Sequence, residues 1–406
     1  MRTIELINKI LMYLFIICYF YQFIYLIISF FPEKKKTTND TLHKYAILIA
    51  ARNEEKVIGN LINSLKNQNY PQEYIDIYVC ADNCTDKTAE IARLNGAIVY
   101  KRENKAQIGK GYVLNYLLKE IAKQNKLYDA YIVFDADNIL DNNYILEMNR
   151  TFNSGYEIIT SYRNCKNYGD NWISAGYGLW YLHESSQLSS ARMKLNTSCA
   201  VNGTGFLFSQ NILNKCNNWN FFLLTEDIEF SVYNIINKEK IGYCSKAILF
   251  DEQPTNFKQS FQQRLRWSKG YLQVLKKYGL DLIKGVFKGS FSCYDMLMNI
   301  APAAILSFIG VITNLFAFIF GYADNTSLIQ LCYNSYLTLF IIGLSTTITQ
   351  WKQIYCSPFE KIIYLFTFPL FMLTYIPISI VAIFAKVKWT PIKHERSLNL
   401  KEIKGE

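Results

Sequence analysis

Ala130-Tyr131-Ile132-Val133-Phe134-Asp135-Ala136-Asp137 is an apolar run that ends in a pair of aspartates, and two similar segments, each an apolar run followed by a polar residue, lie upstream. The apolar run predicts a buried strand, and the aspartates follow where that strand ends. Asp82 follows the apolar run at 77–81, and Asn53 follows the run at 46–51. Ligands bind beyond the carboxyl ends of strands in open α/β sheets. We therefore expect these polar side chains to share one edge of a sheet.

Strand-like and helix-like segments alternate from residue 46 to about 250, which is typical of a soluble α/β domain. Such alternation predicts a mostly parallel sheet with helices on both faces, and we place the domain at 37–270. The expected strands are 46–51, 74–81, 97–100 and 130–134, and the expected helices are 57–65, 85–94 and 112–122.

An apolar segment precedes this domain. Residues 10–31 form an uncharged run of about 22 residues, long enough to cross the hydrocarbon core of a membrane. The cluster Pro32-Glu33-Lys34-Lys35-Lys36 follows it and predicts that the domain lies on the cytosolic side. Residues 1–36 are therefore expected to be a transmembrane helix with its basic flank.

The C-terminal part of the chain also predicts membrane association. Residues 271–296 are amphipathic and predict helices that lie in the membrane interface. Spanning helices are expected within 297–385, at 297–320, 328–348 and 362–385. We therefore expect an integral plasma-membrane protein whose α/β domain is cytosolic and whose partners include membrane lipid.

The tail at 386–406 raises a question of sidedness. It is basic, which is typical of the cytosolic side, yet four single crossings would place it outside. The link Gly321–Ser327 has no basic residue whereas 351–361 has two, which matches an outside loop followed by an inside loop. Pro369 and Pro377 could break the last apolar segment into a re-entrant or two-part element, which would return the tail to the cytosol.

Composition limits the class of function. Of 406 residues, 50% are hydrophobic and 19% are charged, which is too apolar for a purely soluble enzyme and too charged for a wholly embedded transporter. The net charge of +10 reflects lysine clusters beside apolar segments, and no motif of a nucleic-acid-binding module is present, so we expect no nucleic-acid partner. Ten cysteines without paired metal-ligand spacing and only three histidines argue against a disulfide framework and a zinc site.

The aspartate pair suits a divalent cation. Asp135 and Asp137 offer oxygen ligands to Mg²⁺ or Mn²⁺, with diphosphate oxygens completing the shell. Such a pair alone is more often two solvated loop carboxylates, and its place after a buried strand favours the metal site. Asp82 can accept hydrogen bonds from a uracil ring or a ribose; the alternative is a cap for the helix near Thr85.

Further candidates for nucleotide binding leave the first strand and precede the third expected helix. Ala51, Asn53 and Glu54 should line the nucleotide pocket, although Glu54 and Glu55 could equally be first-turn residues of the following helix. Lys110, in Gly109-Lys110-Gly111, is placed to contact a phosphate, and a surface lysine without that role is an even alternative.

Thr225-Glu226-Asp227 contains the strongest candidate for a general base. Asp227 follows the apolar residues 221–224, whose wall could raise its pKa towards the working range of a base. The structural alternative is an N-cap for the helix that follows. The small residues of Val201-Asn202-Gly203-Thr204-Gly205-Phe206 suit a loop through which an acceptor approaches, and a tight turn without substrate contact is the alternative.

Gln263-Arg264-Leu265-Arg266-Trp267 is the last candidate motif. Gln263 and Arg266 lie three apart and share a helix face, from which they can hold a leaving diphosphate. Trp267 offers a flat face for stacking on an acceptor sugar, or it packs where the domain meets the membrane. Arg264 and Lys269 could face lipid headgroups.

These motifs resemble the membrane-bound processive members of glycosyltransferase family 2, namely cellulose, hyaluronan, chitin and poly-N-acetylglucosamine synthases. The similarity covers about 46–270. It implies a GT-A fold, a UDP-sugar donor, Mg²⁺ or Mn²⁺, and inversion at the anomeric carbon. The implied roles are nucleotide binding for Asp82, metal and diphosphate contact for Asp135 and Asp137, general base for Asp227, and closure over donor and acceptor for Gln263, Arg266 and Trp267.

The expected function is transfer of glucose or N-acetylglucosamine from a UDP-sugar to a growing β-linked polysaccharide, with export of the polymer as a further expectation. The chief alternative is addition of one sugar to a membrane lipid, because ceramide glucosyltransferase-like enzymes share these aspartates and a similar Q-x-x-R-W pentad. A single N-terminal crossing, where many synthases have two, makes a secretion channel less secure than the transfer chemistry.

Overall fold

The computed structural model describes residues 2–32, 41–321 and 325–405, which divide into two compact units. The sheet unit comprises Glu33–Asn167, Arg192–Gln253 and Lys388–Glu406, and the helical unit comprises Met1–Pro32, Tyr168–Ala191 and Pro254–Val387. The C-terminal tail thus belongs with the sheet, whereas 168–191 and 254–270, inside the expected domain, belong with the helices. We describe each unit by itself.

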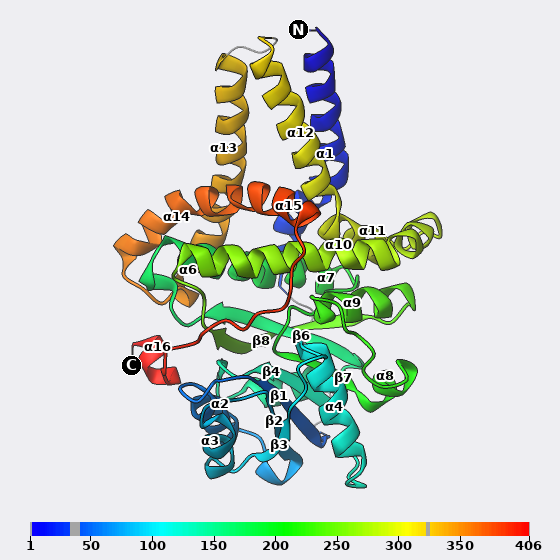
Figure 1. Ribbon diagram of the computed structural model, residues 1–406, viewed down its shortest axis with the longest axis vertical. Coiled ribbons are helices and arrows are strands. Elements are labelled where there is room, and N and C mark those ends of the chain that lie inside the picture. The colour runs from blue at the N-terminus through cyan, green and yellow to red at the C-terminus, as the bar shows by residue number, and fades with distance from the viewer. Residues whose placement is uncertain (1, 33–40, 322–324, 406) are drawn as a thin grey trace. The chain divides into compact units, whose positions relative to one another are not determined.

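The sheet unit is built on one mixed sheet with the strand order β3-β2-β1-β4-β7-β6-β8-β5 (Figure 1). β1, β2, β3 and β4 are parallel, as expected, but β7 runs antiparallel to both β4 and β6, and β5 runs antiparallel to β8. The expected α/β class is confirmed, with a sheet that is parallel only in part. The strands are β1 Tyr45–Ala51, β2 Ile75–Asp82, β3 Ile98–Arg102, β4 Ala130–Asp135, β5 Ile139–Leu140, β6 Ile158–Cys165, β7 Phe206–Ser209 and β8 Ile241–Asp251.

Helices cover both faces of this sheet because its buried strands are apolar on both sides. Alternate residues of a strand face opposite ways, so Ile47 and Ile49 pack against α2 and α5 while α4 contacts β1 and β2 from the other face. On β7, Phe206 and Phe208 lie against Trp219 and α9. The helices are α2 Ile58–Lys66, α3 Thr88–Leu94, α4 Lys110–Ala122, α5 Tyr144–Asn153, α8 Gln210–Lys215, α9 Glu226–Ile236 and α16 Leu400–Lys404, with α7 Ser190–Lys194 at the boundary between the units.

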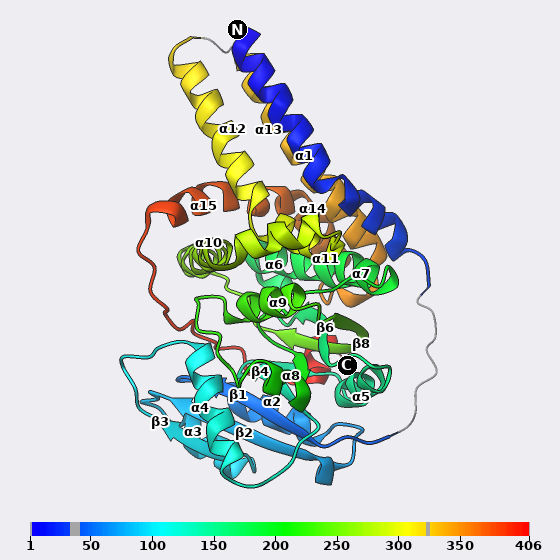
Figure 2. The same ribbon diagram turned by 90° about the vertical axis from the view of Figure 1, so that its right-hand side faces the viewer.

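The helical unit consists of long apolar helices, three of which (α1, α12 and α13) project together from the layer that contains α10, α14 and α15 (Figures 1 and 2). Two stretches, Leu6–Ser29 and Pro358–Phe384, have the length and composition of a membrane span. Lys34 to Lys36 of the basic cluster, and residues 322–324 of the link after α12, lie outside the described residues. The helices are α1 Arg2–Ser29, α6 Trp172–His183, α10 Phe257–Phe287, α11 Phe291–Ile300, α12 Pro302–Ile319, α13 Asn325–Thr349, α14 Pro358–Leu373 and α15 Tyr375–Phe384.

The last apolar segment is broken at Thr374 into α14 and α15, in line with the two-part alternative. Arg264 of α10 is fully buried and donates to the Thr374 hydroxyl at 2.6 Å and to the Phe371 carbonyl at 3.3 Å. Lys269 donates to the Ala382 carbonyl at 3.0 Å. The expectation that Arg264 faces lipid headgroups is therefore wrong, because its guanidinium is fully buried against the end of α14.

Candidate active site at the carboxyl edge of the sheet

Three neighbouring parallel strands end at one edge of the sheet unit. β1 lies between β2 and β4, with Ala51 opposite Ala81 and Ala50 opposite Asp135. Asp82 ends β2, so the side chains expected to meet at the strand ends do share an edge. This edge is where open α/β sheets bind ligands.

Lys110 joins two of the candidate elements. Its ammonium group, at the start of α4, forms an ion pair with the Asp135 carboxylate and donates to the Gly203 carbonyl at 2.7 Å. Only 12% of the Lys110 side chain is exposed, so the alternative of an uninvolved surface lysine is wrong. Gly111 is required beside it, because a Cβ there would lie 2.0 Å from the Phe221 carbonyl oxygen. The Gly-Lys-Gly turn thereby packs against the segment that leads to Asp227.

Asp135 and Asp137 differ in exposure. The Asp135 carboxylate is 38% exposed, whereas Asp137 is buried and its Oδ2 accepts the Glu252 N–H at 2.7 Å. Burial acts to raise the pKa of Asp137, but the charges of His394 and Lys166 outweigh it and lower that pKa below its ordinary value. Asp137 is therefore ionised at neutral pH.

The oxygen donors of this pair suit Mg²⁺ or Mn²⁺. Within the described part of the chain, no group of three His, Cys, Asp or Glu side chains could hold a metal ion. A cation bound to Asp135 and Asp137 would therefore need further oxygens from its substrate, which is the arrangement that the sequence predicts.

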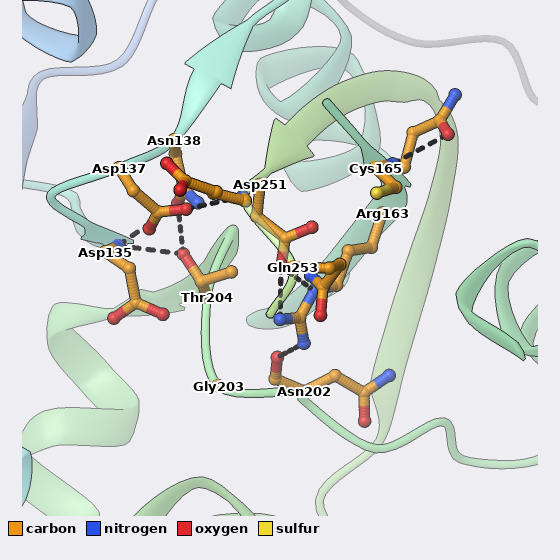
Figure 3. Close-up of polar contacts among 12 residues, drawn as sticks. Asp135, Asp137, Asn138, Arg163, Cys165, Asn202, Gly203, Thr204, Asp251 and Gln253 are labelled. Carbon is orange, nitrogen blue, oxygen red and sulfur yellow. Dashed lines mark hydrogen bonds and ion pairs between the residues drawn. The ribbon is translucent and has the colours of Figure 1, made fainter. Parts of the chain in front are cut away.

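The loop that carries Gly203 and Thr204 is tied to β4 and β6 (Figure 3). The Asp135 N–H donates to the Thr204 hydroxyl at 2.9 Å, and Arg163 donates to the Asn202 carbonyl at 2.9 Å. Gly205 has φ +63, and a Cβ there would lie 1.9 Å from Leu249, so only glycine fits. The loop is thus a fixed turn beside Asp135.

Arg163 and Asp251 were not predicted as site residues. The Arg163 Nε donates to the Asp251 carboxylate at 2.7 Å, and the two residues lie on the paired strands β6 and β8. Burial raises the pKa of Asp251 to about 6, while Arg163 acts to lower it. In the sequence, the only sign of this pair is one charged residue near the end of each of two apolar strands. The contact between Arg163 and Asp251, which are 88 positions apart, is visible only in the fold.

Asp227 lies in the first turn of α9, beside this loop. A Cβ on Gly203 would lie 3.7 Å from the Asp227 Oδ2. The helix begins at Glu226 with Thr225 at the N-cap position, so the alternative that Asp227 is the N-cap is wrong. Burial raises the pKa of Asp227, and burial together with the Asp227 charge raises the pKa of Glu226 to about 8. Asp227 is only partly buried, so its carboxylate is the accessible member of the pair.

Asp82 is buried against a cation. Its carboxylate lies 2.5 Å from the Arg102 Nη1, and Arg102 also donates to the Gln107 carbonyl at 2.9 Å. The capping alternative is wrong, because α3 begins at Thr88 and the Thr88 N–H donates to Asp86. Arg102 was another residue that the sequence did not single out.

The residues that follow β1 complete this edge of the sheet. Asn53 has φ +57 and accepts the Thr85 N–H at 2.8 Å, which joins the ends of β1 and β2. Glu54 is buried and precedes α2, which has no acidic residue in its first turn, so the first-turn alternative is wrong. Burial raises the pKa of Glu54. Ala51 ends β1 and is also buried.

Gln263, Arg266 and Trp267 belong to the helical unit, on the single helix α10, so the expected three-residue spacing on one helix is confirmed. Trp267 packs edge-on against Tyr177 of α6, with ring centroids 5.8 Å apart, within an aromatic cluster that includes Phe371. All three residues keep part of their surface exposed.

Comparisons with known proteins identify the family of this chain. The model of a family described as "Glycosyltransferase like family 2" matches residues 43–270. A β-monoglucosyldiacylglycerol synthase of Nostoc sp. is 26% identical over 287 residues, covering 67% of this chain and 58% of that protein. A poly-β-1,6-N-acetyl-D-glucosamine synthase of Staphylococcus epidermidis is 22% identical over 263 residues, covering 61% and 60%. The chain thus spans about three fifths of the length of these curated relatives.

A solved structure supports the fold over most of the chain. The mannosyltransferase PcManGT from Pyrobaculum calidifontis, in complex with GDP-Man and Mn²⁺, aligns with a TM-score of 0.62 and covers 94% of this chain and 99% of its own. The two sequences are 12% identical, so the likeness concerns the fold.

Proposed function

Because this chain belongs to glycosyltransferase-like family 2, whose members transfer sugar from a nucleotide sugar, we propose that it moves glucose or N-acetylglucosamine from a UDP-sugar to an acceptor hydroxyl with inversion. The observation that carries the proposal is the position of Lys110. It bonds both to Asp135 and to Gly203, and Gly203 adjoins Asp227. A candidate base and a candidate diphosphate site therefore meet at one turn.

In this proposal Asp227 accepts the proton of the acceptor hydroxyl as the new bond to the anomeric carbon forms and the bond to the diphosphate oxygen breaks. Its raised pKa brings it closer to the range in which a carboxylate is an effective base. Glu226 and Thr225 frame it, one as a buried carboxyl whose pKa is about 8 and the other as the N-cap residue.

The leaving diphosphate gains charge and needs cations. Asp135 and Asp137 would hold Mg²⁺ or Mn²⁺, which when bound neutralises part of that charge. The Lys110 ammonium adds a second positive charge beside Asp135, and we assign Gln263 and Arg266 to hydrogen bonds with the diphosphate.

The two substrates are assigned to different parts of the site. Ala51, Asn53, Glu54 and Asp82 are proposed to bind the nucleotide, with Arg102 holding the Asp82 carboxylate in place. Gly203, Thr204 and Gly205 are proposed to border the acceptor, and the exposed part of Trp267 is proposed to stack on its sugar ring.

The first candidate acceptor is the end of a growing β-linked polysaccharide, and the second is a membrane lipid. The glucosyldiacylglycerol synthase of Nostoc favours the second, because it matches at higher identity and over more of this chain than the polysaccharide synthase does. In either case the acceptor is presented at a membrane, which we propose the apolar helices of the helical unit enter.

The test is transfer of radiolabel by the purified protein in nanodiscs with Mn²⁺ or Mg²⁺. UDP-glucose and UDP-N-acetylglucosamine are supplied separately, and the products are sized after lipid extraction. High-molecular-weight label supports the polysaccharide acceptor, and label confined to the lipid phase supports the glycolipid. No transfer from either donor by folded protein would refute the proposed donor and reaction.

A further inference from the structure

The turn at 202–205 begins at a carbonyl group that an arginine of β6 holds in place. The Arg163 Nη1 donates to the Asn202 carbonyl at 2.9 Å (Figure 3). The next residue, Gly203, lies beside the proposed base, since a Cβ there would be 3.7 Å from the Asp227 Oδ2. The hydrogen bond from Arg163 therefore fixes the part of the turn that adjoins Asp227.

The rest of the turn is held by other groups. Three further hydrogen bonds fix it, namely Lys110 to the Gly203 carbonyl at 2.7 Å, the Asp135 N–H to the Thr204 hydroxyl at 2.9 Å, and the Ser161 hydroxyl to the Gly205 carbonyl at 2.7 Å. None of these three bonds involves Arg163. Loss of the arginine would therefore loosen Asn202 and leave the contact between the turn and Asp135 in place.

The Arg163 guanidinium is itself held by Asp251. In the parallel register of β6 and β8, Asp251 lies opposite Cys165. Arg163 is two positions before Cys165 and so projects from the same face of the sheet. The Arg163 Nε donates to the Asp251 Oδ2 at 2.7 Å, and its Nη2 bonds to the same oxygen. Two nitrogens thus bind the carboxylate, and the third reaches Asn202.

This double use of one cation depends on the shape of arginine. The guanidinium is planar and carries five N–H donors in fixed directions, whereas a lysine ammonium acts as a point charge on a flexible stem. Only 14% of the Arg163 side chain and 4% of the Asp251 side chain are exposed, so both are held by the surrounding packing. The carboxylate therefore sets the direction in which Nη1 points.

We propose that Arg163 and Asp251 are positioning residues for the acceptor, because Asp251 fixes the guanidinium and the guanidinium fixes the Asn202 carbonyl, which keeps the start of the turn where the acceptor hydroxyl meets Asp227. This inference rests on the proposed function. The pair acts through the turn, and the proposal assigns it neither proton transfer nor donor binding.

The experiment separates positioning from stability by removing both partners together. Loss of one partner leaves a buried charge unpaired and is strongly destabilising, whereas apolar residues of similar volume in place of both are often tolerated. R163M/D251L should therefore have a thermal midpoint close to that of wild type, although it lacks the hydrogen bond to Asn202. R163K keeps a cation beside Asp251 and should recover only part of the function.

The measurements use the full-length protein in nanodiscs with Mn²⁺ and radiolabelled UDP-sugar. The acceptors are diacylglycerol in the nanodisc and, in a separate arm, a β-linked oligosaccharide. The readout is the ratio of label transferred to the acceptor to free sugar released by water, and calorimetry gives the dissociation constant for UDP. We expect this ratio to fall roughly 10- to 100-fold in R163M/D251L, as loss of a charge-assisted hydrogen bond and a displaced reactant do, with UDP binding within twofold of wild type.

R150M is the matched control, because it makes the same substitution at the exposed ion pair of Arg150 with Glu147 on α5. A folded R163M/D251L whose ratio lies within twofold of wild type overturns the inference, since the pair would then be only structural. An equal loss of transfer and hydrolysis overturns it as well. If the double variant does not fold, a wild-type ratio in R163K has the same meaning. Wild-type protein that neither transfers nor hydrolyses the sugar refutes the proposed function instead.

Discussion

Replacing Gly205 by alanine should destabilise the sheet unit through two separable terms. The first is conformational, because Gly205 has φ +63 and a non-glycine residue there costs about 1–2 kcal/mol. The second is steric, because the new Cβ would lie 1.9 Å from the Leu249 Cδ2 and 2.6 Å from the Ser161 Oγ, and forcing a methyl group into a packed site costs about 1–3 kcal/mol. The expected loss is therefore roughly 2–5 kcal/mol.

Gly155 provides the matched control. Its φ is +94, and a Cβ there would meet nothing within 4 Å. G155A should therefore have the conformational cost of a residue with positive φ without the steric cost. The difference between the two variants should be about 1–3 kcal/mol, which corresponds to roughly 2–12 °C in the midpoint of thermal unfolding for a unit of this size.

The assay is thermal unfolding of wild type, G155A and G205A, followed by sugar transfer below each midpoint. G205A should also lose transfer, because the displaced turn carries Thr204 away from the Asp135 N–H. A midpoint for G205A at or above that of G155A would show that the turn is not packed as described, and full activity in G205A would show that the turn does not position the site.

Three further predictions concern the proposed chemistry. D227N should lower kcat by about 10²–10⁴-fold with UDP binding nearly intact, and undiminished turnover would remove Asp227 as the base. W267A should impair acceptor use more than donor hydrolysis, and an equal loss of both, measured as acceptor KM against UDP release, would argue against stacking. Because the folded-state pKa of Glu226 is raised from 4.5 to about 8, the folded state binds more protons than the unfolded one, so the free energy of unfolding should fall as pH rises through that window. E226Q should flatten this fall in denaturant titrations at several pH values, and an unchanged slope would contradict the raised pKa.

The parts of the fold that could be predicted are those in which a pattern of neighbouring residues, such as an apolar run, indicates the element. The apolar run before Asp135 predicted β4, and the same pattern predicted β1 and β2, so the shared edge followed from strand direction alone. Helix bounds were less accurate, because the turn at 85–87 delays α3 until Thr88 and the Gly-Lys-Gly turn starts α4 at Lys110.

The parts that could not be predicted depend on partners that are distant in sequence. Arg102 pairs with Asp82 across 20 positions, Arg163 with Asp251 across 88, and His394 with Glu54 across 340. No local pattern marks such pairs, since they arise from the order of strands in the sheet. The short strand β7 was missed for a related reason, because it was expected to be only the end of a glycine-rich loop.

The attachment of the tail to the sheet unit has a topological consequence. Between Gln253 and Lys388 the chain leaves that unit and returns to it. A chain that returns to its starting side of a bilayer must cross it an even number of times. Where the apolar segments of this interval enter a membrane, as we propose, an even number of them therefore crosses it. The stretch Pro358–Phe384 has the length of a span, and the break at Thr374 divides it into helices of 16 and 10 residues.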